Sequence, residues 1–257
     1  MKPFLDAIDP VDLPIPSRQL VTQGVIPALI ESLALNGVEA WLSGDLDPVV
    51  EMHNRSDGEM PLFQLFNPRF QLDVSPSTCV VIVAMRARNI IGTVGCRRKW
   101  IPTTLAEEME SLRIYYADPA AMAAPGERCV VGAPLGRSIK SCYVAFSGGG
   151  FVSRPERGRG TYRAMTRLLG VWTAAHWRFS WSVGLARPKT ASALGFDAYG
   201  FSTAEPRVYR LVPGQRYEDR EYWLLAASYS HWSDTFLAQE AADLAVPLRQ
   251  LVGVYSG

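Results

Sequence analysis

Residues 141–177 read SCYVAFSGGGFVSRPERGRGTYRAMTRLLGVWTAAHW, and this stretch decides the fold. Its first part is rich in residues that favour strands, so we predict a strand over 141–146 that is interrupted by glycines 148–150 and resumes at 151–152. After residue 160, apolar side chains recur at helical spacing, at Met165, Leu168, Leu169, Trp172 and Ala175. The unit is therefore a strand, a glycine-rich loop and a helix.

A glycine-rich loop between a strand and a helix exposes backbone N–H groups at the positive end of the helix, which favours an anion. Gly158 and Gly160 let the main chain approach a phosphate, and Arg157, Arg159 and Arg163 can add charged contacts. No Gly-Lys-Ser/Thr follows, and the third glycine of a G-x-G-x-x-G pattern is replaced by Arg163. The loop predicts a pyrophosphate site, with an ordinary solvated turn as the alternative.

The flanking sequence predicts further strands and helices. Alternating or continuous apolar runs indicate strands over 79–85, 90–96, 179–185, 207–211 and 222–226, the first two joined as a hairpin. Apolar side chains at helical spacing indicate helices over 17–36, 105–116, 189–198 and 233–248. Pro27 is a kink or boundary of the first, and Thr104 with Glu107 forms a capping box for the second. Residues 117–138 read as a connecting loop.

Composition limits the class of protein. The chain has 257 residues, of which 48% are hydrophobic and 20% charged, with a formal net charge of +1. One large domain, or one core with appended elements, is expected, and no bulk charge attracts nucleic acid or an anionic membrane. No apolar run reaches the ~20 residues that span a bilayer, and acids and prolines interrupt residues 1–16. We expect a cytoplasmic protein.

Cysteine and histidine spacing does not predict a metal site. Four cysteines are widely separated, at positions 79, 96, 129 and 142, and the three histidines are isolated. We expect free, buried or half-buried thiols. The run CRRKW at 96–100 is interpreted as a solvated strand end, with a phosphate or nucleotide contact as the alternative.

The loop sequence has a known counterpart. Followed by an amphipathic helix, it resembles the acyl-CoA-binding motif Q/R-x-x-G-x-G/A of the GNAT acetyltransferase superfamily. Arg157 fits the first position and Gly160 the fourth, but the sixth, usually Gly or Ala, is Tyr162. This bulky side chain could crowd the ligand or stack on part of it. The order of elements is also similar, and the resemblance covers about residues 76–226.

The resemblance implies a fold and a ligand. The fold is α/β, with a mixed, mostly antiparallel twisted sheet flanked by helices, and the co-substrate is acetyl-CoA or another acyl-CoA. Residues 1–75 would be a helical or irregular extension, 76–226 the acyltransferase core with a helical insert near 103–118, and 227–257 a helical tail. The implied ligand contacts are Phe151 and Val152 for pantetheine, and Arg157, Gly158, Arg159, Gly160, Thr161, Tyr162 and Arg163 for the pyrophosphate.

Two details of the resemblance concern the reacting atoms. The glycines 148–150 either form a bulge that leaves an N–H for the thioester carbonyl or are a flexible strand end. Relatives often use a Glu on the strand before the loop and a Tyr four residues before a Gly-Phe pair. In this chain the strand over 142–152 has no carboxylate. The residues four positions before the two Gly-Phe pairs, at Gly195 and Gly200, are Ala191 and Phe196, so the usual tyrosine is absent in both cases.

The first remaining candidate for a catalytic residue is Tyr199, whose alternative role is to pack in the core. Tyr143 and Ser147 are weaker candidates. The expected activity is transfer of an acetyl group to an amine of a small molecule or peptide. The alternative is a non-catalytic CoA-binding sensor or protein-interaction module. We expect neither nucleic acid nor a membrane as a partner, and leave a homodimer open.

Overall fold

The computed structural model describes residues 2–3, 24–44, 46–47, 49–50, 64–213 and 221–232. Its strands are β1 (Lys2–Pro3), β2 (Glu39–Ser43), β3 (Cys79–Arg86), β4 (Asn89–Thr104), β5 (Arg128–Val131), β6 (Lys140–Val152), β7 (Trp181–Ala186), β8 (Thr203–Leu211) and β9 (Glu221–Ser228). Its helices are α2 (Ile26–Leu35), α4 (Leu105–Glu110), α5 (Pro119–Met122), α6 (Pro134–Ser138), α7 (Thr161–His176) and α8 (Pro188–Leu194), with short 3-10 helices η3 (Gln64–Phe66), η4 (Arg154–Glu156) and η5 (Asp197–Tyr199).

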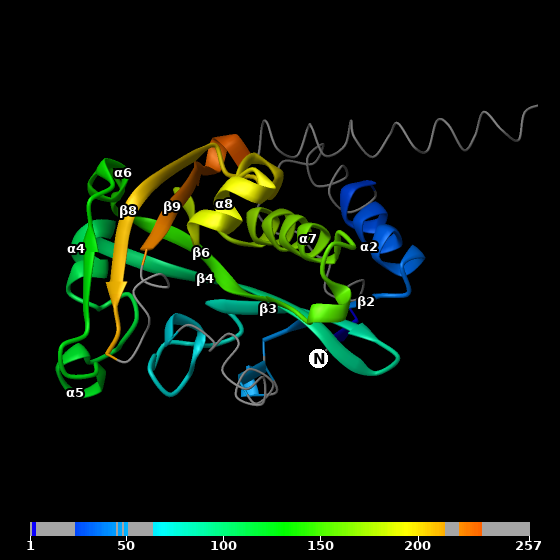
Figure 1. The fold of residues 1–257 in the computed structure, drawn as a ribbon, viewed down its shortest axis with the longest axis horizontal. Helices are drawn as coiled ribbons and strands as arrows, with labels where there is room; N and C mark the ends of the chain where they lie inside the picture. Colours follow the sequence, from blue (N-terminus) through cyan, green and yellow to red (C-terminus); the bar gives the residue numbers. More distant parts are fainter. Residues whose placement is uncertain are drawn as a thin grey trace, which may run out of the picture.

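The described strands form one sheet in the order β1-β2-β3-β4-β6-β7-β9-β8-β5. Only β6 and β7 run parallel among these neighbours, and the other pairs are antiparallel. The predicted fold class, a mixed and mostly antiparallel sheet flanked by helices, is confirmed. In Figure 1, α2, α7 and α8 lie on one face of this sheet and α4 lies toward the other.

Each face of the sheet buries its own apolar core. On the first face, Leu29 of α2 and Leu168 of α7 pack with strand residues such as Ile82. On the second, Leu105 and Met109 of α4 pack with residues that include Phe66 of η3. We call these two sides of the sheet the α7 face and the η3 face. The residues packed on each face determine where a ligand can approach the strands. No helix in the described ranges is long and apolar enough to cross a membrane.

Most predicted elements are present, with changed bounds. The hairpin of β3 and β4 is confirmed, as is the helix that follows the glycine-rich loop. The first helix is described from Ile26, with Pro27 in its first turn and Gly37 in the left-handed region (φ 67°) after its end. Residues 17–23 of that prediction, and the predicted helix over 233–248, lie outside the described residues. The four cysteines are free and buried, as predicted.

Three predictions about secondary structure were wrong. The strand over 140–152 is continuous, because the glycines bulge without breaking its pairing with β4. The capping box of Thr104 and Glu107 does begin α4, but this helix ends at Glu110 and not at 116, since Leu112 takes a left-handed φ of 62°. The segment 117–138 is not a plain loop, because it contains two short helices and β5, which pairs with β8 at the edge of the sheet.

Candidate functional site

The centre of the site is a split between the parallel strands β6 and β7. They pair only where Val144–Ser147 face Trp181–Gly184. Beyond that point β6 remains paired with β4 as far as Val152, and β7 remains paired with β9 as far as Ala186. The two strands therefore diverge, and each presents one edge to the gap. Such an edge offers backbone N–H and C=O groups to an extended ligand that carries amides of its own.

A β-bulge lies in β6 at the start of the split. Gly95 pairs with Gly148 and Thr93 with Phe151, so two residues of β6 face one of β4. Gly149 has a φ of 61°, which favours glycine, and its carbonyl accepts a hydrogen bond of 3.1 Å from Thr93 Oγ1. The glycine triplet is thus an ordered bulge and not a flexible strand end.

The glycine-rich loop is an open cradle at the N-terminus of α7. Gly158 and Gly160 have φ values of 81° and 78°, and a Cβ placed on either would meet no heavy atom within 4 Å. Gly160 is also the N-cap of this 16-residue helix, whose first amides have no partner within the helix. Next to it, the hydroxyl of Thr161 is buried without a hydrogen-bond partner among the described residues. The residues present fit an anionic group such as a diphosphate.

Charged side chains anchor the loop to its surroundings. Glu156 accepts two hydrogen bonds from Arg86, of 3.1 and 3.0 Å, and lies 3.7 Å from the guanidinium of Arg159. Arg157 Nε donates to the carbonyl of Val152, at 3.1 Å. Arg157 and Arg159 therefore contact the protein itself, and the main-chain amides of the loop and the exposed Arg163 remain as ligands for a phosphate.

A cavity of about 60 Å³ lies on the α7 face, at the split. It is lined by Ser147 and Gly148 of β6, by Tyr162 and Thr166 of α7, and by Leu185 of β7. The wall is completed by Val94, Gly184, Ala186, Thr190, Ala191, Phe196, Tyr199, Phe201 and Leu225. The sequence predicted four of these positions, Ser147, Gly148, Tyr162 and Tyr199, and the structure brings all four together.

Tyr162 points into this cavity rather than out to solvent. A Cβ at Gly150 would lie 2.2 Å from Tyr162 Oη, so the ring lies directly over this glycine. The ring also meets Tyr199 edge to face, with centroids 5.7 Å apart. Ligand pockets commonly enclose about 300–1,000 Å³. The cavity of about 60 Å³ is therefore smaller than a typical ligand pocket, and the ring of Tyr162 fills the space over Gly150.

The predicted catalytic residues differ in their relation to the cavity. Tyr199 lines it, is 7% exposed, and has a pKa raised mainly by burial, which makes its hydroxyl a weaker acid than that of an ordinary tyrosine. Ser147 lines it as well, and its hydroxyl donates to Cys96 Sγ at 3.8 Å. Tyr143 does not line it: this residue is 44% exposed and packs against Trp100 and Arg98. The geometry thus favours Tyr199 and Ser147 over Tyr143.

A second, smaller cavity opens on the η3 face of the same split. It has a volume of about 10 Å³ and is lined by Leu65, Phe66, Tyr115, Phe146, Ser147, Gly148 and Leu185. Ser147, Gly148 and Leu185 line both cavities, so the two meet at the gap between β6 and β7. Phe66 and Tyr115 were not predicted, because they come from segments far from the loop in sequence and carry no motif.

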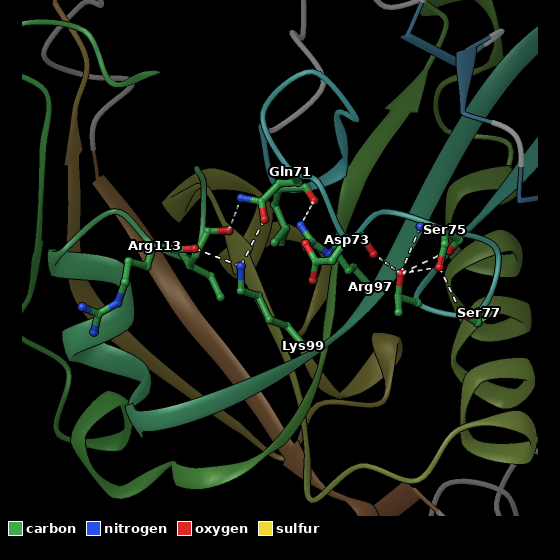
Figure 2. A network of polar contacts seen from close by, with 10 residues as sticks. Gln71, Asp73, Ser75, Ser77, Arg97, Lys99 and Arg113 are labelled. Atoms are coloured by element: carbon green, nitrogen blue, oxygen red, sulfur yellow. Dashed lines mark hydrogen bonds and ion pairs between the residues drawn. The ribbon is translucent and has the colours of Figure 1, made fainter. Parts of the chain in front are cut away.

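Polar side chains on the η3 face form the network in Figure 2. Arg97 is completely buried; its Nη1 donates to the carbonyl of Leu65 at 2.6 Å, and it forms an ion pair with Asp73. Lys99 Nζ donates to Gln71 Oε1 at 3.1 Å and to the carbonyl of Arg113 at 2.9 Å. The interpretation of residues 96–100 as a solvated strand end was therefore wrong, since alternation along β4 turns Arg97 and Lys99 inward.

Stability should depend on pH through Lys99. Burial, together with the nearby Arg97 guanidinium, lowers the pKa of Lys99 from its ordinary 10.5 to about 8. Between these pH values the unfolded chain holds more protons than the folded one, so stability rises with pH. We expect the free energy of unfolding, relative to that of Lys99→Met, to rise by about 2 kcal/mol from pH 8 to pH 10. Urea titrations of both proteins measure this, and a difference that does not change with pH would contradict it.

The chain is similar to known proteins in its structure. No model of a protein family matches the chain, and no curated protein matches it. Among solved structures, Arabidopsis thaliana NAA60 in complex with a bisubstrate analogue is 14% identical, over 74% of this chain and 97% of that chain, with a TM-score of 0.41. An acetyltransferase of the GNAT family from Streptococcus pneumoniae is 10% identical, over 74% and 99% of the chains, with a TM-score of 0.37.

A third solved structure is the CoA-dependent acyl-homoserine lactone synthase BjaI with SAM and isopentyl-CoA. It is 13% identical, over 84% of this chain and 82% of that chain, with a TM-score of 0.36. At these identities and TM-scores the likeness does not extend to activity or acceptor, for which only the chain's own residues provide evidence.

Proposed function

We propose that this protein is an acyl-CoA-dependent N-acyltransferase that transfers an acetyl group to an amine of a small molecule or peptide. One observation carries the proposal: the open cradle at the N-terminus of α7 leads directly to the split between β6 and β7. A diphosphate held by the cradle would place the rest of the ligand along the free edge of β6. The resemblance of the loop to the GNAT motif supports the same ligand.

The route from the cradle to the reacting atoms follows β6. The pyrophosphate would lie on the amides of residues 157–163, with the hydroxyl of Thr161 as a further donor. Pantetheine amides would pair with the edge at Phe151 and Val152. Val152 lies four residue steps after Gly148, which is roughly 13 Å along a strand. The thioester would therefore lie near Ser147 and Gly148, where the two cavities meet.

Residues at this point can assist acyl transfer. The uncharged amine attacks the thioester carbonyl, a C–N bond forms, and the C–S bond breaks to release a thiolate. An N–H of the bulge at Gly149 and Gly150 would stabilise the tetrahedral oxyanion, and the hydroxyl of Tyr199 would donate a hydrogen bond to the departing thiolate, which takes its proton from solvent. With no carboxylate among the residues that line either cavity, the acceptor amine would lose its proton to solvent.

The same lack of a lining carboxylate favours a second candidate function, a CoA-binding sensor or interaction module without catalysis. Both functions need the cradle, and only the first needs turnover. Release of free CoA thiol from acetyl-CoA, screened against amines, amino acids and short peptides, separates them.

Acetyl-CoA should stabilise the folded protein under either function. At a concentration 100 times the dissociation constant, a ligand that binds only the folded state adds about 2.7 kcal/mol to its stability. We therefore expect a rise in Tm of several degrees in a thermal unfolding experiment with saturating acetyl-CoA, and thiol release on adding the correct amine. No rise in Tm at millimolar acetyl-CoA would reject the proposal as a whole.

The position of Tyr162 leads to a prediction about affinity. If its ring must leave Gly150 before the ligand binds, the competent state is only a fraction of the population, and the apparent Kd is raised by that fraction. Tyr162→Ala, which places a small residue at the sixth motif position, should tighten CoA binding about tenfold by calorimetry. Tyr162→Phe keeps the ring and should bind like the parent. Weaker binding by Tyr162→Ala would mean that the ring contacts the ligand instead.

A further inference from the structure

We infer that Lys99 binds a carboxylate of the acceptor, so that the substrate is an amine that also carries an acidic group, such as the N-terminus of an acidic peptide. The inference rests on the proposed function and names the acceptor class that it leaves open. It begins from the side of the sheet that an acceptor can use. The pantetheine arm would take the larger cavity on the α7 face, so the amine would approach the thioester from the η3 face.

Lys99 lies on this η3 face, a short way along the sheet from the point where the two cavities meet. In β4, Arg97 opposes Phe146 of β6 and Lys99 opposes Val144, and both of these β6 residues belong to the core of the η3 face. Ser147, which lines both cavities, lies three residue steps after Val144. This is roughly 10 Å along a strand, a distance that the amine and the acidic group of one acceptor can span.

Side chains connect Lys99 to the smaller cavity. Its Nζ donates to Gln71 Oε1 at 3.1 Å, and Gln71 Nε2 donates to the carbonyl of Ile114 at 3.3 Å. The next residue, Tyr115, lines the cavity. Figure 2 shows Lys99 Nζ between Gln71 and the carbonyl of Arg113, to which it also donates. Lys99 and the cavity therefore belong to one continuous surface of the η3 face.

The partners of Lys99 differ from those of the arginines around it. Arg97 pairs with Asp73, and Arg113 pairs with Glu108 at 2.8 Å. Among the described residues, Lys99 forms no ion pair, and it donates only to a neutral amide oxygen and a carbonyl. These five side chains comprise three cations and two carboxylates. A carboxylate of the acceptor would balance the remaining positive charge and accept from the third N–H of the ammonium.

A ligand can reach this position from solvent. The side chains of Asp73 and Arg113, which flank Lys99 in Figure 2, are 60% and 51% exposed, and Lys99 is half-buried. With a pKa of about 8, Lys99 still carries its proton for the most part at pH 7. In the described part of the chain, the buried Nε of Arg97 also has no hydrogen-bond partner, so a second donor of this face is unused.

Calorimetric titration of the CoA-saturated full chain with matched dipeptides tests the inference. Gly-Glu amide and Gly-Gln amide have the same amine and nearly the same size, but only the first has a carboxylate. The parent should bind Gly-Glu amide about tenfold more tightly, as expected for one hydrogen bond between charged groups. Gly-Gly and Gly-Gly amide form a second pair, which shows whether a C-terminal carboxylate serves in the same way. Lys99→Met should remove the preference, and Lys99→Arg, which keeps the charge, should retain it.

Arg98→Met is the matched control. Arg98 is the neighbour of Lys99 in β4, but it opposes Ala145, which belongs to the core of the α7 face. Its guanidinium lies 4.8 Å from the ring centre of Tyr143. The variant therefore loses the same charge from the other side of the sheet, and it should keep the parent's preference. CoA itself should bind both variants as it binds the parent, since neither side chain lies in the cradle.

Several results would overturn the inference. It is wrong if the CoA-bound parent binds none of the peptides, or if it prefers the carboxylate in neither pair. It is also wrong if folded Lys99→Met keeps the preference, or if Arg98→Met loses it equally, since a general positive field would then select the peptide. Lys99→Gln takes the place of a variant that does not fold. Binding of CoA separates the two proposals: if CoA does not bind the parent, the proposed function fails as well.

Discussion

Gly160→Glu is expected to weaken acyl-CoA binding at least 100-fold and to remove the rise in Tm that acetyl-CoA produces. Gly160 lies at the N-cap of α7, where a Cβ would enter open space in the cradle. A glutamate there would put a negative charge at the place proposed for the diphosphate, and its carboxylate could itself take the free helix amides. A loss of about 2.7 kcal/mol or more of binding free energy corresponds to this change.

Two control variants separate the charge from the backbone. The φ of 78° at Gly160 imposes a cost of about 1 kcal/mol on any L-residue. Gly160→Ala carries this cost alone, and Gly160→Gln adds the bulk of glutamate without its charge. We expect their Kd values to fall between that of the parent and that of Gly160→Glu. If all three variants bind CoA as the parent does, measured by calorimetry, the loop does not hold the diphosphate.

Glu127→Leu is expected to destabilise the folded protein by about 3–5 kcal/mol. The carboxylate of Glu127 is 2.7 Å from Arg210, and the two side chains are 1% and 5% exposed. Removing the carboxylate leaves a buried guanidinium with only neutral partners, Gln64 and the hydroxyl of Tyr116. Denaturant unfolding of the parent and the variant gives the difference directly.

The double variant Glu127→Leu, Arg210→Met tests whether the unpaired charge of Arg210 causes this loss of stability. Replacing both charges by apolar side chains should recover most of the loss, because no unpaired charge remains. Arg137→Met is a second control, since Arg137 pairs with Glu110 at an exposed position (58% and 31% exposed) and should change stability by less than about 1 kcal/mol. If Glu127→Leu costs no more than Arg137→Met, the ion pair of Glu127 and Arg210 does not stabilise the folded protein as described.

Local sequence predicts the elements whose causes are local. The loop, the helix after it and the hairpin were predicted because glycine positions and apolar spacing act over a few residues. The start of α4 was predicted for the same reason, from the capping box of Thr104 and Glu107. The end of α4 was not predicted. Leu112 and Tyr116 continue the apolar spacing of a helix, and both are buried. Leu112 has a left-handed φ, however, so turns and not a helix bring the side chains after it into the core.

Long-range packing decides the rest of the site. Arg97 and Arg210 are charged residues that a sequence pattern places on the surface, yet both are buried. The carbonyl of Leu65 and the carboxylate of Asp73 compensate the charge of Arg97, and Glu127 compensates that of Arg210. No local sequence pattern reveals these partners. The strand β5 was hidden in a segment rich in Ala, Pro and Gly, because its pairing partner lies about 80 residues later. The inward position of Tyr162 likewise depends on Gly150, a neighbour in space only.

The most direct test of the account is a crystal structure of the protein with bound CoA. It should show the diphosphate on the main-chain amides between Gly158 and Tyr162, the pantetheine arm along β6 from Val152 toward Gly148, and the ring of Tyr162 moved off Gly150. CoA bound elsewhere, with the loop facing solvent and the ring still covering Gly150, would contradict it.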